Sequence, residues 1–292
     1  MSIIAYLNGK FIPAEEASIS PLDRGMVFGD GVYEVIPVFN RKILYLEEHL
    51  DRLNQSLQGI RMTLPHTHAE WKSLLTTLVE ENNLNHGGEH QWIYLQVTRG
   101  FQLVRDHQIP NNLTPTVFAI SYPKILTSKE EQAQGIKVIA TTDIRWKYCY
   151  IKTTARLAYT LMYQEAKDAG VDEAIIINNG YALEGTSSNF FMVRHGVIST
   201  PPKGPLLLSG ITRDKILALA EKHKIPYREN KISERELLKA DEIWITSSIR
   251  GIYPVVEFNG EPISNGKAGP FWSKMWDYYA EDITNLSLSV SN

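Results

Sequence analysis

The chain changes character after Tyr122-Pro123, and this break constrains its fold more than any other feature. The segment that starts there, YPKILTSKEEQAQG, is rich in charged and polar residues, which is typical of a connection between domains. A chain of 292 residues is long enough for one large domain or two of ordinary size. We therefore predict an N-terminal domain over 1–122, a linker over 123–130 and a C-terminal domain over 131–292.

The first half predicts an α+β domain. Two β-hairpins are expected, one over IIAYLNGKFIP with a type I′ turn at Asn8-Gly9, and one over residues 32–46. Leucines at helical spacing in LEEHLDRLNQSL predict a helix, and a second helix is expected from about His68 to Glu81. The segments WIYLQVTRG and TVFAISYP are typical of strands that flank a polar loop.

The second half alternates strands and helices. Strands are expected in IKVIATTD, DEAIIINN, NFFMVRHGVIST and DEIWITSS, and helices in ARLAYTLMYQEAKDAG, in ITRDKILALAEKHK and after Pro270. This alternation predicts a mixed α/β or barrel-like domain, but periodicity alone leaves its topology open.

Composition excludes several classes of protein. The net charge is -3 and the sequence pI is near 6.3, which argues against a nucleic-acid-binding surface. The single cysteine, Cys149, excludes an intrachain disulfide framework and a cysteine-only metal site, and it fits a reducing compartment. The N-terminal apolar run is too short for a signal peptide, and no stretch approaches the length of a membrane span. We expect a cytoplasmic enzyme.

Known catalytic motifs of other classes are absent from the sequence. It contains no HExxH or CxxC motif for a metal and no GxGxxG or GxxxxGK[ST] motif for a nucleotide. The GxSxG motif of hydrolases is absent as well.

Glu184 precedes a polar run and then the apolar residues of EGTSSNFFMV. A carboxylate at the start of a buried strand is costly unless a positive group meets it. No arginine or lysine lies near it in sequence, so its partner is expected from elsewhere in the fold or from a ligand.

Lys152 lies in YCYIKTTARLA, where we expect the end of a strand followed by a helix. Partial desolvation there would lower the pKa of its amine and favour attack on an aldehyde. The alternative is a surface lysine whose aliphatic stem packs on the protein.

Three further segments are candidates for phosphate binding. Ile211 and Thr212 follow Ser209-Gly210 at the start of a helix, where free amide groups attract anions. Ser247 and Ser248 end the strand DEIWITSS, and Arg52 lies on the leucine-rich helix. Taken singly, each also fits a plain helix cap, a turn or a solvated charge.

Arg105 and His107 stand two residues apart on the polar loop RGFQLVRDHQIP. Together they have the chemistry to bind a carboxylate, although both also fit the description of exposed loop charges.

These motifs together resemble the class IV aminotransferases, the fold-type IV pyridoxal-phosphate enzymes. The run EGTSSNFF, then Thr200, then LSGITR is similar to the signature of that family, and DRGMVFGDGVYE, HLDRL and the IK of Lys152 resemble its other blocks. The resemblance covers almost the whole chain. It implies an α+β fold of two domains, a smaller N-terminal α/β domain and a larger C-terminal mixed α/β pseudo-barrel domain.

The resemblance also implies a role for each candidate residue. Pyridoxal 5'-phosphate would form a Schiff base with Lys152, its ring nitrogen would meet Glu184, and Leu208 would pack on its ring face. The anchors of its phosphate would be Arg52, Ile211, Thr212 and Ser248, with Ser247 assisting.

Within the class, the loop with Arg105-Asp106-His107 resembles the D-amino-acid transaminases. That branch implies a homodimer in which Tyr33, together with Arg105 and His107 of the neighbouring subunit, binds the substrate carboxylate. One departure is Ala155, where relatives often have asparagine.

The expected reaction is a ping-pong transamination between a D-amino acid, such as D-alanine, D-glutamate or D-aspartate, and a 2-oxo acid, such as 2-oxoglutarate or pyruvate. A branched-chain L-aminotransferase and an aminodeoxychorismate lyase are alternatives on the same fold. A ligand-binding protein without catalysis is the alternative from another class. Neither nucleic acid, membrane nor metal is expected as a partner.

Overall fold

The computed structural model describes residues 2–86 and 88–288, which form two compact units. Unit 1 takes the described residues of Met1–Leu126, Ile151–Ala155 and Leu286–Asn292, and unit 2 takes Thr127–Tyr150 and Arg156–Asn285. The expected division into consecutive segments places residues 151–155 and 286–288 in the second domain, whereas their packing groups them with unit 1.

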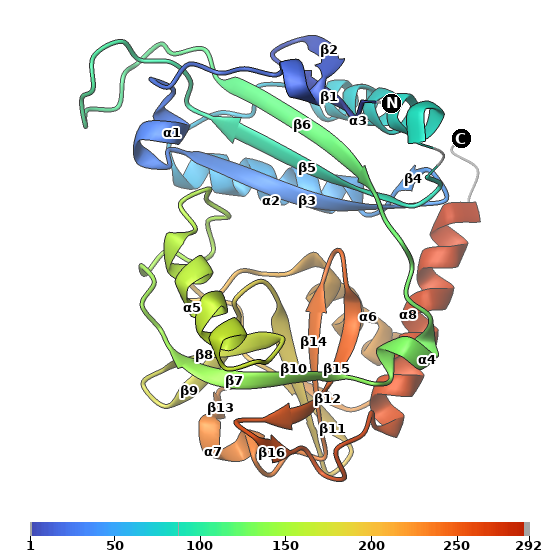
Figure 1. Ribbon diagram of the computed structural model, residues 1–292. Coiled ribbons are helices and arrows are strands. Elements are labelled where there is room, and N and C mark those ends of the chain that lie inside the picture. Colours follow the sequence, from blue (N-terminus) through green and yellow to red (C-terminus); the bar gives the residue numbers. More distant parts are fainter. Residues whose placement is uncertain (1, 87, 289–292) are drawn as a thin grey trace. The chain divides into compact units, whose positions relative to one another are not determined.

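Unit 1 is built on one antiparallel sheet (Figure 1). Its six strands, in order across the sheet, are β2 (Lys10–Pro13), β1 (Ile4–Leu7), β6 (Thr116–Pro123), β5 (Gln91–Thr98), β3 (Gly31–Phe39) and β4 (Lys42–Ile43). Each pair of neighbours runs antiparallel. The first hairpin turns at Asn8 and Gly9, which have φ angles of 47° and 94°, as the expected type I′ turn requires.

Two long helices, α2 (Leu46–Gly59) and α3 (His68–His86), pack on this sheet. Leu50, Leu53 and Leu57 of α2 are fully buried, as their helical spacing predicts. The short elements η1 (Ala14–Glu16) and α1 (Arg24–Phe28) connect β2 to β3. Asp23 caps α1 by accepting a hydrogen bond from the Gly25 amide at 2.8 Å.

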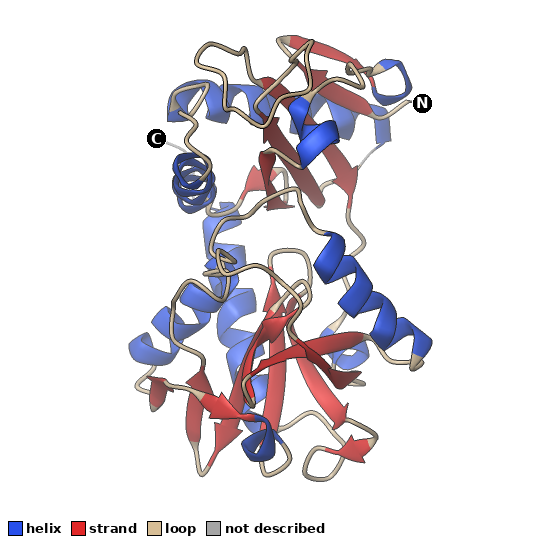
Figure 2. Ribbon diagram, turned by 90° about the vertical axis from the view of Figure 1, so that its left-hand side faces the viewer, coloured by secondary structure: helices blue, strands red, loops and turns tan. Residues whose placement is uncertain are grey.

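Unit 2 contains a larger mixed sheet that curls (Figure 2). Its strand order is β12 (Tyr227–Glu229), β11 (Val197–Thr200), β10 (Asn189–Arg194), β14 (Glu242–Ser247), β15 (Gly251–Phe258), β7 (Ile136–Thr142), β8 (Glu173–Asn178), β9 (Tyr181–Gly185) and β13 (Ile232–Ser233), with β16 (Glu261–Pro262) on β15. The pairs β15 with β7, β7 with β8, and β11 with β12 are parallel. The others are antiparallel, and the expected mixed pseudo-barrel is confirmed.

Both faces of the unit 2 sheet are buried. One face packs on itself around Phe190, Ile243 and Phe258. The other carries Phe191 and Trp244, which pack with residues of α6 (Ile211–Lys222) and α8 (Pro270–Leu288). The remaining helices are α4 (Lys129–Gln132), α5 (Leu157–Asp168) and α7 (Glu234–Leu237). Because successive residues of β10 and β14 face opposite sides and both sides are covered, both strands are buried except at their last residue.

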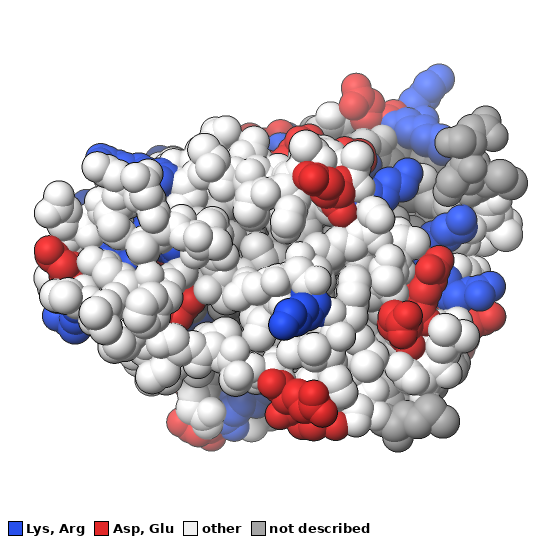
Figure 3. All heavy atoms as spheres, turned by 90° about the horizontal axis from the view of Figure 1, so that it is seen from above, with Lys and Arg blue, Asp and Glu red and all other residues white. Residues whose placement is uncertain are grey.

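None of the described helices has the length and hydropathy of a membrane span. On the face seen in Figure 3, cationic and anionic side chains are interspersed among uncharged ones. This mixture agrees with the small net charge of the chain.

Candidate active site

Lys152 lies in unit 1, in an irregular segment beside β3. Its amide donates to Ser56 Oγ at 3.1 Å, and its carbonyl accepts from the Tyr33 amide at 3.0 Å. The expectation that a strand leads into Lys152 is wrong. A single isolated bridge joins Thr153 to Val32. The Lys152 amide bonds to a side chain instead of to a neighbouring strand, so this segment forms no regular ladder.

Tyr33, one of the residues predicted to bind the substrate, lies beside Lys152. The Lys152 Nζ atom is 4.3 Å from the centroid of the Tyr33 ring. The ring is buried and stacks on Tyr94 with centroids 5.7 Å apart. Lys152 and Tyr33 are thus brought together within unit 1, with the lysine stem half-buried.

Arg52 is fixed by a buried carboxylate that the sequence analysis did not single out. Its Nε and Nη2 atoms donate to the two carboxylate oxygens of Glu34 at 2.8 and 2.7 Å. His49, one turn earlier on α2, places Nδ1 2.8 Å from the same carboxylate. Burial raises the pKa of Glu34, but the charge and hydrogen bonds of Arg52, helped by His49, outweigh it and hold that pKa well below its usual range.

His49 carries a buried nitrogen that no described residue meets. Burial lowers the pKa of His49, which favours a neutral ring. Its Nδ1 faces Glu34, whereas Nε2 is buried without a hydrogen-bond partner among the described residues. Such an atom is costly unless a ligand or water meets it. The Glu34, His49 and Arg52 cluster therefore fits a bound polar group.

Arg105 and His107 meet at one aromatic ring. The Arg105 Cζ atom lies 4.8 Å from the centroid of Phe28, and the His107 ring lies 5.1 Å from it. Both side chains are exposed. The two residues predicted to bind a carboxylate thus contact the same ring in unit 1, at the end of α1.

Glu184 lies in unit 2 on its own strand, β9, rather than at the start of the Asn189 strand. Only 3% of the residue is exposed. The positive group expected to meet Glu184 is Arg145, which is distant in sequence and donates from Nη1 to Glu184 Oε1. The Leu208 amide donates to the other carboxylate oxygen at 3.0 Å, so Glu184 ties down the backbone of a second predicted residue.

Arg145 is itself held on several sides. Asp143 accepts from its Nε and Nη2 at 2.8 and 3.0 Å, and the Leu206 carbonyl accepts from Nη2 at 2.9 Å. Burial lowers the pKa of the Arg145 guanidinium, but Asp143 and Glu184 outweigh it and keep that pKa above its usual value. Arg145 is therefore a fixed cation.

Burial raises the pKa of Glu184 to about 7, although Arg145 and the Leu208 amide favour its charged form. A carboxyl group in this condition gains from a second cationic donor. A protonated ring nitrogen is such a donor, so the surroundings of Glu184 fit the pyridine of the expected cofactor.

The start of α6 offers backbone amides without a side-chain cap. The N-cap is Gly210, which has no side-chain capping hydrogen bond among the residues that the structure covers. A Cβ on Gly210 would clash with Asn189 Oδ1, and Asn189 donates to the Leu208 carbonyl at 2.9 Å. Ile211 and Thr212 follow, both buried, and the Thr212 hydroxyl also interacts with Tyr279. The arrangement fits an anion at this helix start.

Ser247 and Ser248 lie where β14 ends, and both are half-buried. Ser247 Oγ accepts from the Arg250 amide at 3.2 Å and so takes part in the turn. Thr246, just before them, has a buried hydroxyl with no hydrogen-bond partner among the described residues. This is a second buried polar atom that fits a missing ligand.

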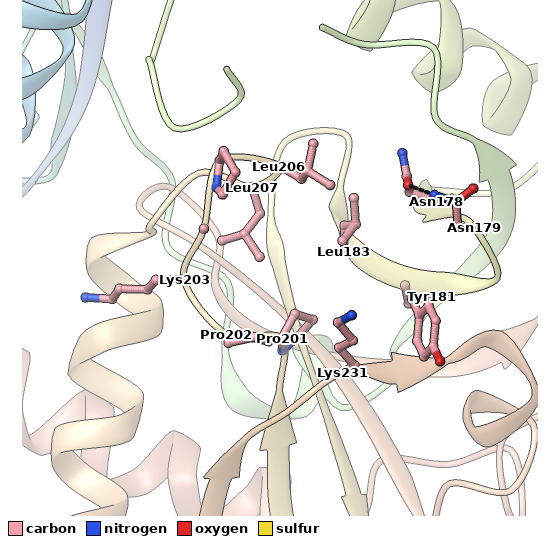
Figure 4. Close-up of a pocket in the computed structure, with 13 residues that line it drawn as sticks. Asn178, Asn179, Tyr181, Leu183, Pro201, Pro202, Lys203, Leu206, Leu207 and Lys231 are labelled. Atoms are coloured by element: carbon pink, nitrogen blue, oxygen red, sulfur yellow. Dashed lines mark hydrogen bonds between the residues drawn. The ribbon is translucent and has the colours of Figure 1, made fainter. Parts of the chain in front are cut away.

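A pocket of about 330 Å³ opens in unit 2 between β9 and the loop over residues 201–207 (Figure 4). Its lining includes Leu183 and Leu207, the neighbours of Glu184 and Leu208. Asn178, also in its wall, donates to Asp143 at 3.1 Å. The pocket thus adjoins the residues that support Glu184, whereas the predicted site residues do not line it in the part of the chain that the structure describes.

Sequence reasoning missed Arg145, Glu34 and His49. A signal existed for Glu34, because VYEVI places a carboxylate inside an apolar run, as EGTSSNFF does for Glu184. For Arg145, in DIRW, the sequence carries no comparable signal. No cluster of three metal-ligating side chains occurs among the residues described.

A family comparison matches residues 31–258 to class IV amino-transferases. Similar curated proteins include a D-alanine aminotransferase of Bacillus licheniformis, 41% identical over 90% of this chain and 91% of that protein. Another is a D-alanine aminotransferase of Staphylococcus epidermidis, 35% identical over 97% of this chain and 99% of that protein.

Similar solved structures include a branched-chain aminotransferase of the thermophilic archaeon Thermoproteus uzoniensis with norvaline. Its TM-score is 0.84 at 26% identity, with 98% of this chain and 96% of that chain covered. The branched-chain amino acid aminotransferase of Escherichia coli has a TM-score of 0.86 at 25% identity, covering 95% of this chain and 92% of that chain.

Proposed function

The chain belongs to the class IV aminotransferases, and from that premise we propose that it transfers amino groups between D-amino acids and 2-oxo acids, with pyridoxal 5'-phosphate as its cofactor. The observation that carries the D-amino-acid part is the similarity, at 33–41% identity over 90% or more of the chain, to proteins named D-alanine aminotransferase. The contact of both Arg105 and His107 with the Phe28 ring supports it, since a guanidinium and an imidazole near one ring are suited to donate to one carboxylate.

For the cofactor we propose the ligands that the family resemblance implies. Lys152 would attach it covalently, and Glu184 would accept the hydrogen bond of its ring nitrogen. The buried atoms His49 Nε2 and Thr246 Oγ1, which have no hydrogen-bond partner in the described part of the chain, support this assignment, because both residues lie near predicted phosphate ligands in sequence. Those ligands are Arg52, Ile211, Thr212, Ser247 and Ser248, and Leu208 would pack on the ring.

When bound, the cofactor supplies an electron sink for the electrons released at the substrate Cα. The residues of the chain do the rest. The Lys152 amine would lie at the substrate Cα, where it would act as the base that removes the proton and as the acid that returns one. Glu184, held by Arg145 and the Leu208 amide, would favour the protonated form of the ring nitrogen.

We assign the recognition of the substrate carboxylate to Tyr33, Arg105 and His107. A guanidinium and an imidazole form charge-assisted hydrogen bonds with a carboxylate. Their position relative to the Lys152 amine selects which face of Cα loses its proton, so the loop sets the chirality of the substrate. D-alanine as donor and 2-oxoglutarate as acceptor both carry the required carboxylate.

We also propose that the enzyme is a homodimer in which the Arg105 and His107 loop acts in the site of the partner. The loop exposes Leu103 and Val104, and Met26 of the nearby α1 is exposed as well, at 72%, 69% and 70%. Exposed apolar side chains grouped in this way favour an interface with a second copy of the chain. The single cysteine supports a reducing compartment, the cytoplasm.

A branched-chain L-aminotransferase is the second candidate, because the similar structures carry that name. The deciding experiment supplies purified enzyme with 2-oxoglutarate and a panel of D- and L-amino acids and separates the products by chiral chromatography. We expect D-glutamate from D-alanine, and no product from the matched Lys152→Ala variant. L-glutamate formed from L-leucine would overturn the D-specific proposal.

A further inference from the structure

Arg24 is a buried cation that the reaction described above does not use. Only 4% of the residue is exposed. It lies at the start of α1, where its amide donates to the Gly100 carbonyl at 2.9 Å. The backbone of Arg24 is therefore fixed within unit 1, close to the first residues of the loop that carries Arg105 and His107.

One side of the Arg24 guanidinium is bound to a shared carboxylate. Nε donates to Asp30 Oδ2 at 2.8 Å. The same carboxylate accepts two hydrogen bonds from Arg99, at 2.7 and 2.9 Å. Burial raises the pKa of Asp30, but the hydrogen bonds from Arg99 and Arg24 outweigh it and hold that pKa below its usual value. Asp30 is thus an anchor for Arg24.

The other side of the guanidinium reaches the loop. Nη1 donates to Gln102 Oε1 at 2.5 Å, to the Asp106 carbonyl at 2.7 Å and, more weakly, to the Gln108 carbonyl at 3.5 Å. Asp106 stands between Arg105 and His107. Arg24 also lies against Phe28, with Cζ 4.7 Å from the ring centroid, and this is the ring that Arg105 and His107 contact.

Besides the bonds from Arg24, the described contacts of this loop with unit 1 include the hydrogen bond from the Gln102 amide to the Leu22 carbonyl at 3.3 Å and the packing of Arg105 and His107 on Phe28. The segment around Asp106 has no regular secondary structure, and its apolar residues Leu103 and Val104 are exposed rather than packed. Among the described residues, the Gln108 amide bonds to Asp106 of the loop itself, at 3.1 Å. Since burial within unit 1 does not fix the loop around Asp106, the bond from Arg24 to the Asp106 carbonyl holds the backbone at that point.

We propose that Arg24 is a positioning residue for the substrate carboxylate, because it holds the Asp106 carbonyl and thereby sets the places of Arg105 and His107. This inference rests on the proposed role of those two residues. It requires arginine at position 24, since separate nitrogens of one planar group bond to Asp30 and to the loop. The single ammonium of a lysine has no second nitrogen with which to span them.

The test compares Arg24→Lys with the matched control Arg99→Lys. Both variants weaken a bond to Asp30, but the remaining acceptors of Arg99 are the Ile60 and Arg61 carbonyls rather than the loop. For Arg24→Lys we expect about a tenfold higher KM for D-alanine and 2-oxoglutarate, with kcat and the absorbance of the bound cofactor little changed. Arg99→Lys should change KM less than about twofold.

Hydrogen exchange of the backbone amides gives a second readout that does not need activity. Arg24→Lys should speed exchange over residues 102–109, and Arg99→Lys should not. Gln102→Ala, which removes one acceptor and no buried charge, should show the same effect more weakly, and it serves if Arg24→Lys fails to fold. If exchange over residues 102–109 is unchanged in both Arg24→Lys and Gln102→Ala, the inference is overturned.

A double-mutant cycle separates this inference from the proposed function. In an Arg105→Ala/His107→Ala background, Arg24→Lys should cost less than about twofold in kcat/KM, because the groups it positions are gone. An equal loss in both backgrounds would make Arg24 a general structural residue and overturn the inference. If Arg105→Ala/His107→Ala itself leaves KM unchanged, the proposed carboxylate site is wrong, whereas the exchange measurement still tests the tether.

Discussion

Arg145 and Glu184, 39 residues apart in sequence, form a buried ion pair in which the side chains are 0% and 4% exposed. The orientation of the Arg145 guanidinium is fixed, because Asp143 and the Leu206 carbonyl accept hydrogen bonds from its other nitrogens. Glu184 is in turn bound to the Leu208 amide. A carboxylate fixed in this way does not need to reorganise when a ring nitrogen binds to it, and such preorganisation is a main source of electrostatic catalysis.

Removing the cation of this pair should destabilise the protein strongly. Arg145→Met leaves the Glu184 and Asp143 carboxylates without their shared partner, and breaking a buried pair in this way costs about 3–5 kcal/mol. We expect a loss of that size in the free energy of urea unfolding. Arg145→Met/Glu184→Gln should recover part of it, since one buried carboxylate is then neutral. A single-variant loss below about 1 kcal/mol would contradict the importance of the pair.

The raised pKa of Glu184 predicts how stability depends on pH. The folded pKa is about 7 and the ordinary value is 4.5, so between these values the folded protein holds a proton that the unfolded chain has released. The contribution of Glu184 to stability therefore falls as pH rises through this window and is constant above it. Wild type without cofactor should lose stability relative to Glu184→Gln between about pH 5 and pH 8, measured by urea unfolding. A difference that is flat or rises with pH would contradict the raised pKa.

Glu34 should act on the cofactor through Arg52. Glu34→Gln removes the negative charge that orients the guanidinium, and the loss of a charge-assisted contact predicts about a tenfold weaker affinity for pyridoxal 5'-phosphate. The matched control is Glu47→Gln, since Glu47 lies on the same helix as Arg52 but is exposed and paired with His68. Titration of the apoprotein of each variant with pyridoxal 5'-phosphate, followed by absorbance, would measure the two affinities. Equal affinities for the two variants would show that Glu34 only supports the fold.

The sequence could predict the elements and the family because both depend on local pattern. The leucine spacing of α2 and the Asn8-Gly9 turn are local signals, and the motif EGTSSNFF has a fixed spacing. The burial of Glu184 agrees with the sequence, although Glu184 lies on β9 and not at the start of the apolar strand β10 from which its burial is predicted. Its role as the ligand of the ring nitrogen stays a prediction.

The partners of these residues could not be predicted, because they come together only in the folded chain. Arg145 reaches Glu184 across 39 residues, and Arg24 reaches Asp106 across 82. The segment of Lys152 also has no local pattern that reveals its conformation. Its backbone bonds to the side chain of Ser56 and to the Tyr33 amide of β3 and forms no ladder with a neighbouring strand. The strand that the apolar residues before Lys152 predict therefore does not form.

Lys152 should be the residue that carries the cofactor. Reduction of the wild-type holoenzyme with borohydride should attach the cofactor irreversibly to the peptide that contains Lys152, which mass spectrometry would identify. Lys152→Ala should show no attachment and almost no transamination, while Lys147→Ala, five residues earlier in the same segment, serves as the control and should retain both. Attachment to a different lysine would refute the assignment.

The last prediction concerns Arg105 and His107 and whether they act across a dimer. Losing one charge-assisted contact to the substrate costs about 1.5–3 kcal/mol, or roughly tenfold to a hundredfold in kcat/KM. Arg105→Ala/His107→Ala should reach at least this loss with D-alanine, with the bound cofactor unperturbed. Mixing these chains with Lys152→Ala chains then distinguishes the two arrangements. If the loop acts in the site of the partner, each mixed dimer contains one site with an intact lysine and an intact loop. A statistical equimolar mixture should therefore recover about a quarter of wild-type activity. If the loop serves its own chain, every site keeps one lesion and no activity returns even though mixed dimers form, as subunit exchange with differently tagged chains would verify.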